Sequence, residues 1–136
     1  MCKIFVYGTL KPDESAYEKY CAPYVTQAEV ALMRGQLFHL PQGYPAMTAG
    51  DLWVTGALLT LRAETAISYI DQFEDYDPDR PTTSNLYQRL QRPVFSPNQQ
   101  PLGTAWVYLM TTARVDALGG ARVDAGVWSR QTFPSI

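Results

Sequence analysis

Two long segments with the pattern of β-strands each carry a glycine in their interior. In residues 25–38, apolar positions recur at alternate residues around Gly35, and residues 51–61, DLWVTGALLTL, contain Gly56. Alternation with a period of two is typical of strands, and an interior glycine lets a strand bend or bulge where a Cβ atom would clash. The sequence therefore predicts bent strands that can curl into a small barrel.

The rest of the chain adds further strands and one clear helix. Strands are expected over about residues 3–7, 86–95 and 103–110, a short helix or turn over 13–20, and a helix over 63–75. The tail, residues 111–136, is expected to wrap back over the body without much regular structure. Mostly strand with one good helix indicates the α+β class, and we expect residues 1–136 to form a single domain.

Composition narrows the possible partners. The chain has 136 residues, of which 46% are hydrophobic and 18% charged, enough for one globular core. Its formal net charge is -2 and it has no run of Lys or Arg, so we expect no nucleic-acid or membrane partner. No apolar stretch approaches the roughly 18 residues of a transmembrane helix, and the N-terminus enters a strand directly. These features predict a cytoplasmic protein.

The few cysteine and histidine residues argue against several kinds of catalytic site. Cys2 and Cys21 are the only cysteines, and we expect both to be free thiols. His39 is the only histidine, so the chain offers no Cys/His cluster for zinc and no motif of a Ser-His-Asp hydrolase. We therefore expect no metal and no cofactor, and we assign His39 no role.

Glu74 does not fit a purely structural interpretation of the helix over 63–75. It follows Ile67 and Ile70 along the apolar face, and it lies near the C-terminal end, where the helix dipole disfavours a negative charge. Both effects raise the pKa of a glutamate above about 4.3, which makes Glu74 a candidate for proton transfer near neutral pH. Nearby carboxylates would act in the same direction; they are Asp71, Asp75, Asp77 and Asp79. The alternative is structural: Glu74 forms an ion pair with Arg89.

The stretch VYGTLKP suggests an anion-binding loop after the first strand. A strand that ends in glycine can present successive backbone N–H groups to an anion, and Tyr7 and Thr9 add hydroxyl donors beside Gly8. A plain turn would explain the same residues. Other candidate lining residues are Tyr44, Tyr87, Arg89 and Tyr108, although Tyr108 alone is most simply a core or sheet residue.

Six segments, taken together and in order, resemble the gamma-glutamylcyclotransferase-like (AIG2-like) family, which includes the plant avirulence-induced proteins and the gamma-glutamylamine cyclotransferases. The segments are VYGTLK at 6–11, GQLFHLPQGYPAM at 35–47, VTGALLTL at 54–61, IDQFEDYDP at 70–78, YQR at 87–89 and AWVYLM at 105–110. The similarity covers residues 1 to about 110 and fades after them.

The resemblance implies a small bent mixed β-barrel with flanking helices and a pocket at one end. It also implies that the loop Tyr7 to Leu10, including Gly8 and Thr9, binds the glutamyl part of the substrate through backbone groups. Glu74 aligns with the catalytic glutamate of the family. The candidate substrate-binding set is then Tyr7, Gly8, Thr9, Leu10, Tyr44, Tyr87, Arg89 and Tyr108.

The implied reaction releases 5-oxoproline from a small gamma-glutamyl amine or peptide. The substrate's own α-amine attacks its γ-carbonyl, so the protein needs no nucleophile, only a group that moves a proton. The other hypothesis is a binding module that keeps the pocket and recognises an anionic metabolite without turnover. A buried carboxylate adds nothing to the binding of an anion, so Glu74 favours the enzyme.

Overall fold

We describe the fold from a computed structural model, which places residues 2–14, 16–74, 76–81 and 85–133. The strands are β1 (Cys2–Val6), β2 (Val25–His39), β3 (Pro45–Leu61), β4 (Gln88–Phe95), β5 (Pro101–Leu109) and β6 (Ala121–Arg122). The helices are α1 (Tyr17–Tyr20), α2 (Ala66–Phe73) and α3 (Thr112–Ala117), with a 3₁₀ turn over Ala22–Tyr24.

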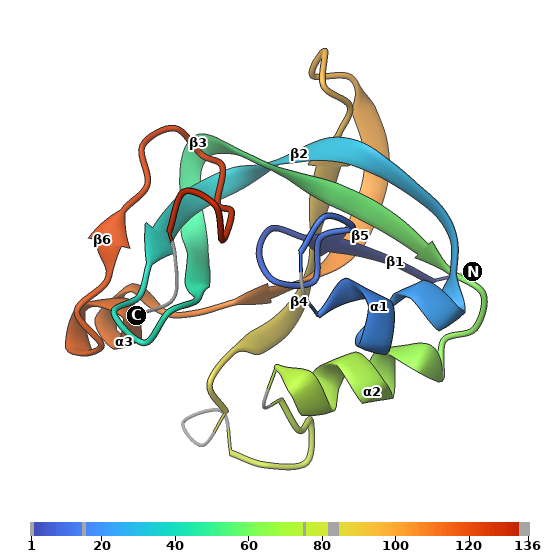
Figure 1. Cartoon of the computed structure of the whole chain (residues 1–136), viewed down its shortest axis with the longest axis horizontal. Coiled ribbons are helices and arrows are strands. Elements are labelled where there is room, and N and C mark those ends of the chain that lie inside the picture. The colour runs from blue at the N-terminus through green and yellow to red at the C-terminus, as the bar shows by residue number, and fades with distance from the viewer. Residues whose placement is uncertain (1, 15, 75, 82–84, 134–136) are drawn as a thin grey trace.

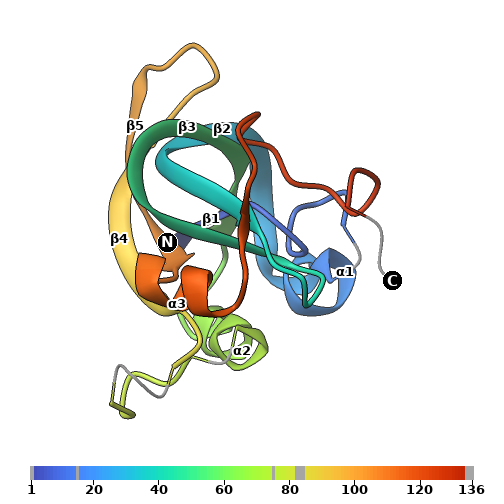
Figure 2. The same cartoon turned by 90° about the vertical axis from the view of Figure 1, so that its left-hand side faces the viewer.

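The strands form one sheet that closes on itself. Their order is β3-β1-β5-β4-β2-β6, and β3 also pairs with β2, so five strands make a ring to which β6 adds at the end of β2. β1 runs parallel to β5, and the other pairs are antiparallel. Figure 1 shows β2 and β3 arching over the other strands, and Figure 2 shows the sheet curling round. The predicted α+β class and bent barrel are confirmed.

The two interior glycines have different roles. The β2–β3 register is irregular at Gly35, where the sequence predicted a bend or bulge: Gly35 pairs with Leu52 but Gln36 pairs with Thr48. The extra residues of this bulge lie in β3, however, and not in β2, which carries the glycine. No such shift occurs at Gly56. There an added Cβ atom would lie 2.2 Å from the carbonyl oxygen of Val6, so glycine permits the close crossing of β1.

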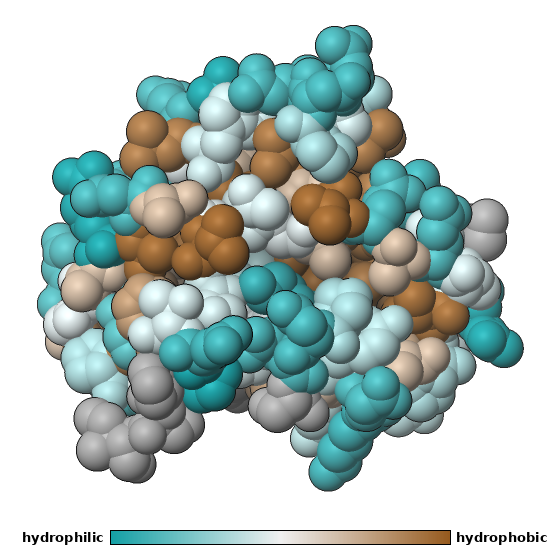
Figure 3. Space-filling view, turned by 45° about the horizontal axis from the view of Figure 1, so that its top comes forward, coloured by the Kyte–Doolittle hydropathy of each residue, from teal (hydrophilic) through white to brown (hydrophobic). Residues whose placement is uncertain are grey.

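Side chains on the two faces of β1 enter two different core clusters. Phe5 packs with Met33, Val54 and other residues of the strands, while Ile4 packs with Ile70 of α2. This alternation follows from the period of two along a strand. The surface over the arching ribbon carries separate apolar groups between hydrophilic residues rather than one continuous patch (Figure 3).

Helix α2 is shorter than predicted, since the residues before Ala66 form turns instead of helix. Glu74 is its C-cap and donates its amide to the carbonyl of Ile70 over 2.9 Å. The expectation for the tail was wrong in part: α3 is a regular helix, capped by the Thr111 side chain accepting from the Arg114 amide at 3.2 Å. Among the helices of the described residues, none combines the length and apolar character needed to cross a membrane.

Candidate active site

A cavity of about 560 Å³ opens between the loop after β1, the β2–β3 turn and the C-terminal end of α2. Seven predicted site residues line it: Tyr7, Thr9, Leu10, Tyr44, Glu74, Tyr87 and Tyr108. Lining residues that the sequence analysis did not propose include Phe5, His39, Gln42, Phe73, Leu86 and Arg130. The volume lies within the range of small-molecule sites, roughly 300–1,000 Å³.

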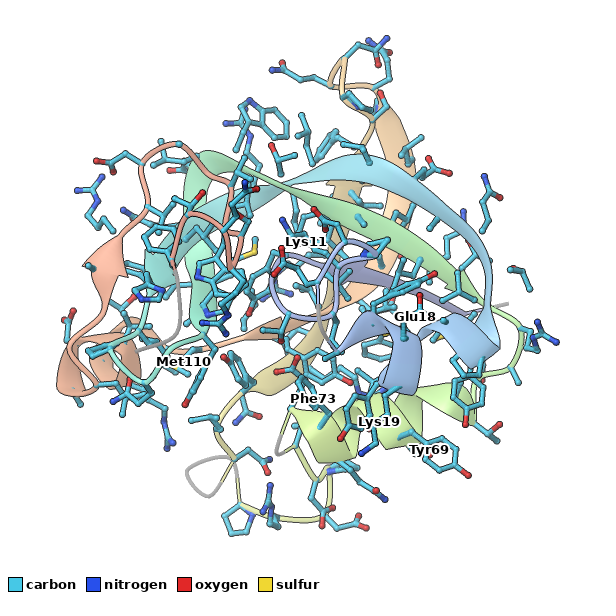
Figure 4. All side chains as sticks on the ribbon, in the orientation of Figure 1. Lys11, Glu18, Lys19, Tyr69, Phe73 and Met110 are labelled. Carbon is cyan, nitrogen blue, oxygen red and sulfur yellow. The ribbon has the colours of Figure 1, made fainter. Side chains whose placement is uncertain are left out.

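Glu74 enters this cavity because α2 ends there. The ring centres of Phe73 and Tyr20 lie 4.5 Å apart, and this contact packs the C-terminal end of α2 against α1. Figure 4 shows Phe73 at this end of α2. The carboxyl of Glu74 makes no hydrogen bond or ion pair with any residue that the structure describes. Burial raises the pKa of Glu74 from 4.5 to about 8. The acid is therefore largely protonated at neutral pH.

The sequence analysis attributed part of this shift to neighbouring aspartates, and that was wrong. Burial alone raises the pKa of Glu74. Asp71 is held by other partners, Asp77 and Asp79 are exposed, and Asp75 lies outside the described residues.

The ion pair between Glu74 and Arg89 does not form. Arg89 instead places its Nε atom 3.1 Å from Oδ1 of Asp71 and stacks its guanidinium 4.5 Å from the ring centre of Trp106. The same Asp71 oxygen accepts a hydrogen bond of 2.6 Å from the Tyr108 hydroxyl. Arg89, although predicted as a site residue, is not among the residues that line the cavity, and Asp71 connects it to the lining residue Tyr108.

Four tyrosines line the cavity that holds Glu74, and the hydroxyls of three of them donate hydrogen bonds. Tyr7 donates to the carbonyl of Tyr108 at 2.6 Å, Tyr87 donates to the carbonyl of Pro45 at 2.7 Å, and Tyr108 donates to Asp71. Burial, with Glu74 nearby, raises the pKa of Tyr7 and of Tyr87 above the ordinary value. These hydroxyls stay protonated, and their bonds hold the wall in place.

The loop after β1 packs tightly against the β2–β3 turn. A Cβ atom on Gly8 would lie 2.3 Å from Cγ of Pro45, so glycine is needed here for contact with the protein itself rather than only with a ligand. The Lys11 amide donates to the Gly8 carbonyl over 3.0 Å, which closes a turn. The amides of Gly8, Thr9 and Leu10 donate to no backbone carbonyl within the described part of the chain. Of the three residues, Thr9 and Leu10 line the cavity, whereas Gly8, although predicted as a site residue, does not.

The tail also contributes to the cavity. Trp128 is fully buried, and its indole Nε1 donates to Nδ1 of His39 at 3.0 Å. Two residues later, Arg130 reaches the cavity lining. His39, to which the sequence analysis gave no role, is thus a lining residue whose ring anchors the tail.

Asp71 is expected to be important for stability. In Asp71→Asn, Arg89 keeps a charge that has lost its partner, which we expect to lower the free energy of unfolding by about 2 kcal/mol. Asp124→Asn is the matched control, because Asp124 pairs with Arg122 at 3.4 Å with both side chains more than half exposed, and no measurable change is expected. Urea denaturation of both variants tests this, and equal effects would contradict the role of Asp71.

Residues 4–130 match the family described as gamma-glutamyl cyclotransferase, AIG2-like. No curated protein sequence matches the chain.

Solved structures show the same fold. An AIG2-like protein from Mus musculus is 20% identical with a TM-score of 0.69, over 91% of this chain and 86% of that one. YtfP from Escherichia coli is 23% identical with a TM-score of 0.60, over 93% and 95% of the two chains. YkqA from Bacillus subtilis is 21% identical with a TM-score of 0.67, over 93% of this chain but only 39% of YkqA.

The family match spans most of the chain, including the loop after β1, α2 and Glu74. The fold of the solved structures agrees with it. The chain therefore belongs to the AIG2-like gamma-glutamyl cyclotransferase family.

Proposed function

We propose that this protein is a gamma-glutamyl cyclotransferase that releases 5-oxoproline from a small gamma-glutamyl compound, with Glu74 as general acid and base. The observation that carries the proposal is the carboxyl of Glu74, which lines the cavity without a protein partner in the described residues and has its pKa raised to about 8. A carboxyl with such a pKa can both accept and return a proton near neutral pH.

The reaction is an internal transfer of the γ-glutamyl acyl group. The α-amine attacks the γ-carbonyl carbon and forms the ring C–N bond, while the bond to the original amide nitrogen breaks. In molecules whose Glu74 is deprotonated, a growing fraction as the pH approaches about 8, the carboxylate takes one proton from the α-ammonium and returns it to the departing nitrogen. The ring nitrogen loses a second proton, which the released amine takes up, so no water or external nucleophile is consumed. Holding both ends of the substrate in one cavity favours the ring closure, because the reaction is already intramolecular.

The raised pKa of Glu74 reduces the energy needed for the first proton transfer. An α-ammonium has a pKa of about 8, so transfer to an ordinary glutamate would be uphill by roughly 5 kcal/mol. With the pKa of Glu74 at about 8, the two groups are nearly matched. Most of the free-energy cost of this proton transfer is therefore removed, so Glu74 can accept the proton and return it.

The loop after β1 supplies the second part of the proposed site. Thr9 and Leu10 line the cavity, and their amides, with that of Gly8, can bind an α-carboxylate or the oxyanion that develops on the γ-carbonyl. Tyr7 and Tyr87 direct their hydroxyls to backbone carbonyls. In this proposal they shape the wall rather than transfer protons.

The test is product formation by the purified protein. We expect 5-oxoproline and one equivalent of free amine or amino acid from gamma-glutamylalanine, gamma-glutamylethylamide or both, measured by chromatography at pH 7 to 9. Tight binding of these compounds without any 5-oxoproline would contradict the proposal and favour a binding module.

A further inference from the structure

Arg130 gives the cavity a fixed positive charge. Within the part of the chain that the structure describes, it is the only Lys or Arg among the lining residues. Glu74 is largely protonated at neutral pH, since its pKa is about 8. Burial and the charge of Arg130 lower the pKa of His39, so His39 is neutral there as well. Near pH 7, the described residues of the cavity lining therefore carry a net positive charge, which is that of Arg130.

The backbone of the tail holds Arg130 in position. Its amide donates to Oε1 of Glu14 at 3.1 Å, and its guanidinium lies 4.9 Å from the ring centre of Trp128, which is fully buried. The carbonyl of Trp128 accepts from the side-chain ammonium of Lys11. These contacts attach the tail to the loop after β1, so little ordering is left to occur when a ligand binds.

The guanidinium itself keeps most of its donors. Among the described residues it donates once, from Nη1 to the carbonyl of Phe133 at 3.3 Å, whereas a guanidinium has five N–H groups. Its Nη1 also lies 3.7 Å from the position of a Cβ atom on Gly43, at the β2–β3 turn. Arg130 thus sits at the turn side of the cavity with donors to offer.

We propose that Arg130 binds a carboxylate on the leaving group, so that the preferred substrates are gamma-glutamyl amino acids or short peptides rather than gamma-glutamyl amines. This rests on the proposed function. The loop amides of Gly8, Thr9 and Leu10 take the α-carboxylate next to the attacking amine, and Arg130 takes the carboxylate at the other end. The scissile amide then lies between the two anchors.

A matched pair of substrates isolates this contact. Gamma-glutamylalanine and gamma-glutamylethylamide share the glutamyl part and differ by the carboxylate on the departing half. A charge-assisted Arg–carboxylate contact is worth a factor of about 10 to 100. We expect the protein to prefer the dipeptide in kcat/KM by that factor, and Arg130→Gln to lose the preference because it lowers kcat/KM for the dipeptide more than for the ethylamide.

Arg122→Gln is the matched control, since it removes the same charge from an exposed position on β6 outside the cavity lining. It should keep the preference, and Arg130→Lys should keep part of it. Equal losses on both substrates in Arg130→Gln, or no preference in the unaltered protein, would overturn the inference while leaving the proposed function intact.

Binding supplies a readout that does not depend on turnover. By calorimetry, the dipeptide should bind at least tenfold more tightly than the ethylamide, and Arg130→Gln should remove the difference. If neither compound yields 5-oxoproline but this difference is found, the proposed function fails and the role of Arg130 stands. Equal affinities would overturn the role of Arg130.

Discussion

Glu74→Gln is expected to lower kcat for 5-oxoproline release by about 10²- to 10⁴-fold, the usual contribution of a general acid or base. Glutamine has nearly the same shape and can occupy the same place at the end of α2, but it cannot accept a proton from the α-ammonium. The substrate should still bind, because the loop amides are unchanged. We therefore expect the loss in kcat and little change in the Kd.

Glu64→Gln is the matched control, because Glu64 is an exposed residue just before α2 and does not line the cavity. Its activity should equal that of the unaltered protein. Full activity in Glu74→Gln would show that another group moves the proton, even if the protein is a cyclotransferase.

The same substitution is expected to stabilise the protein at alkaline pH. In the unfolded chain Glu74 loses its proton around its ordinary pKa of 4.5, whereas in the folded protein it keeps the proton until about pH 8. The folded state therefore binds more protons between these values, and its stability falls as pH rises through that window. The glutamine side chain does not titrate, so the free energy of unfolding of Glu74→Gln does not decrease over this pH range for this reason.

At pH 4 the two proteins should differ little, since the carboxyl is protonated in both states. At pH 8.5 we expect Glu74→Gln to be more stable by about 3 kcal/mol, less than the full shift implies because water still reaches part of the side chain. Urea denaturation at both pH values, with Glu64→Gln beside it, measures the difference. A difference that does not change with pH would contradict the raised pKa of Glu74.

The strands and the position of Glu74 could be predicted from the sequence because their signals are local. Alternating apolar residues predicted β2, and the apolar segment 51–61 predicted the second half of β3, which begins earlier, at Pro45. The spacing of Ile67, Ile70 and Glu74 placed the carboxyl at the inner side of a helix end. The role of Gly56 was not predictable in this way, since it depends on the approach of Val6 from another strand.

Residues that depend on long-range packing were missed. No motif near Arg130 in the sequence indicates that it lines a cavity. Its position depends on the burial of Trp128, two residues earlier in the tail, and on the hydrogen bond from Trp128 to His39. Arg89 shows the same limit, since either Glu74 or Asp71 could have been its partner. Helix α3 did carry local signals, with Thr111 at the N-cap and Gly119 in the left-handed region (φ of 79°) just after it.

The central claim is that burial of the Glu74 carboxyl in the cavity raises its pKa and keeps most of it protonated at neutral pH. The most direct measurement is a titration of the Glu74 side-chain carboxyl carbon by ¹³C NMR, assigned by its loss in Glu74→Gln. We expect a midpoint near the value of about 8 that burial gives this group. A midpoint near the ordinary 4.5 would contradict the account.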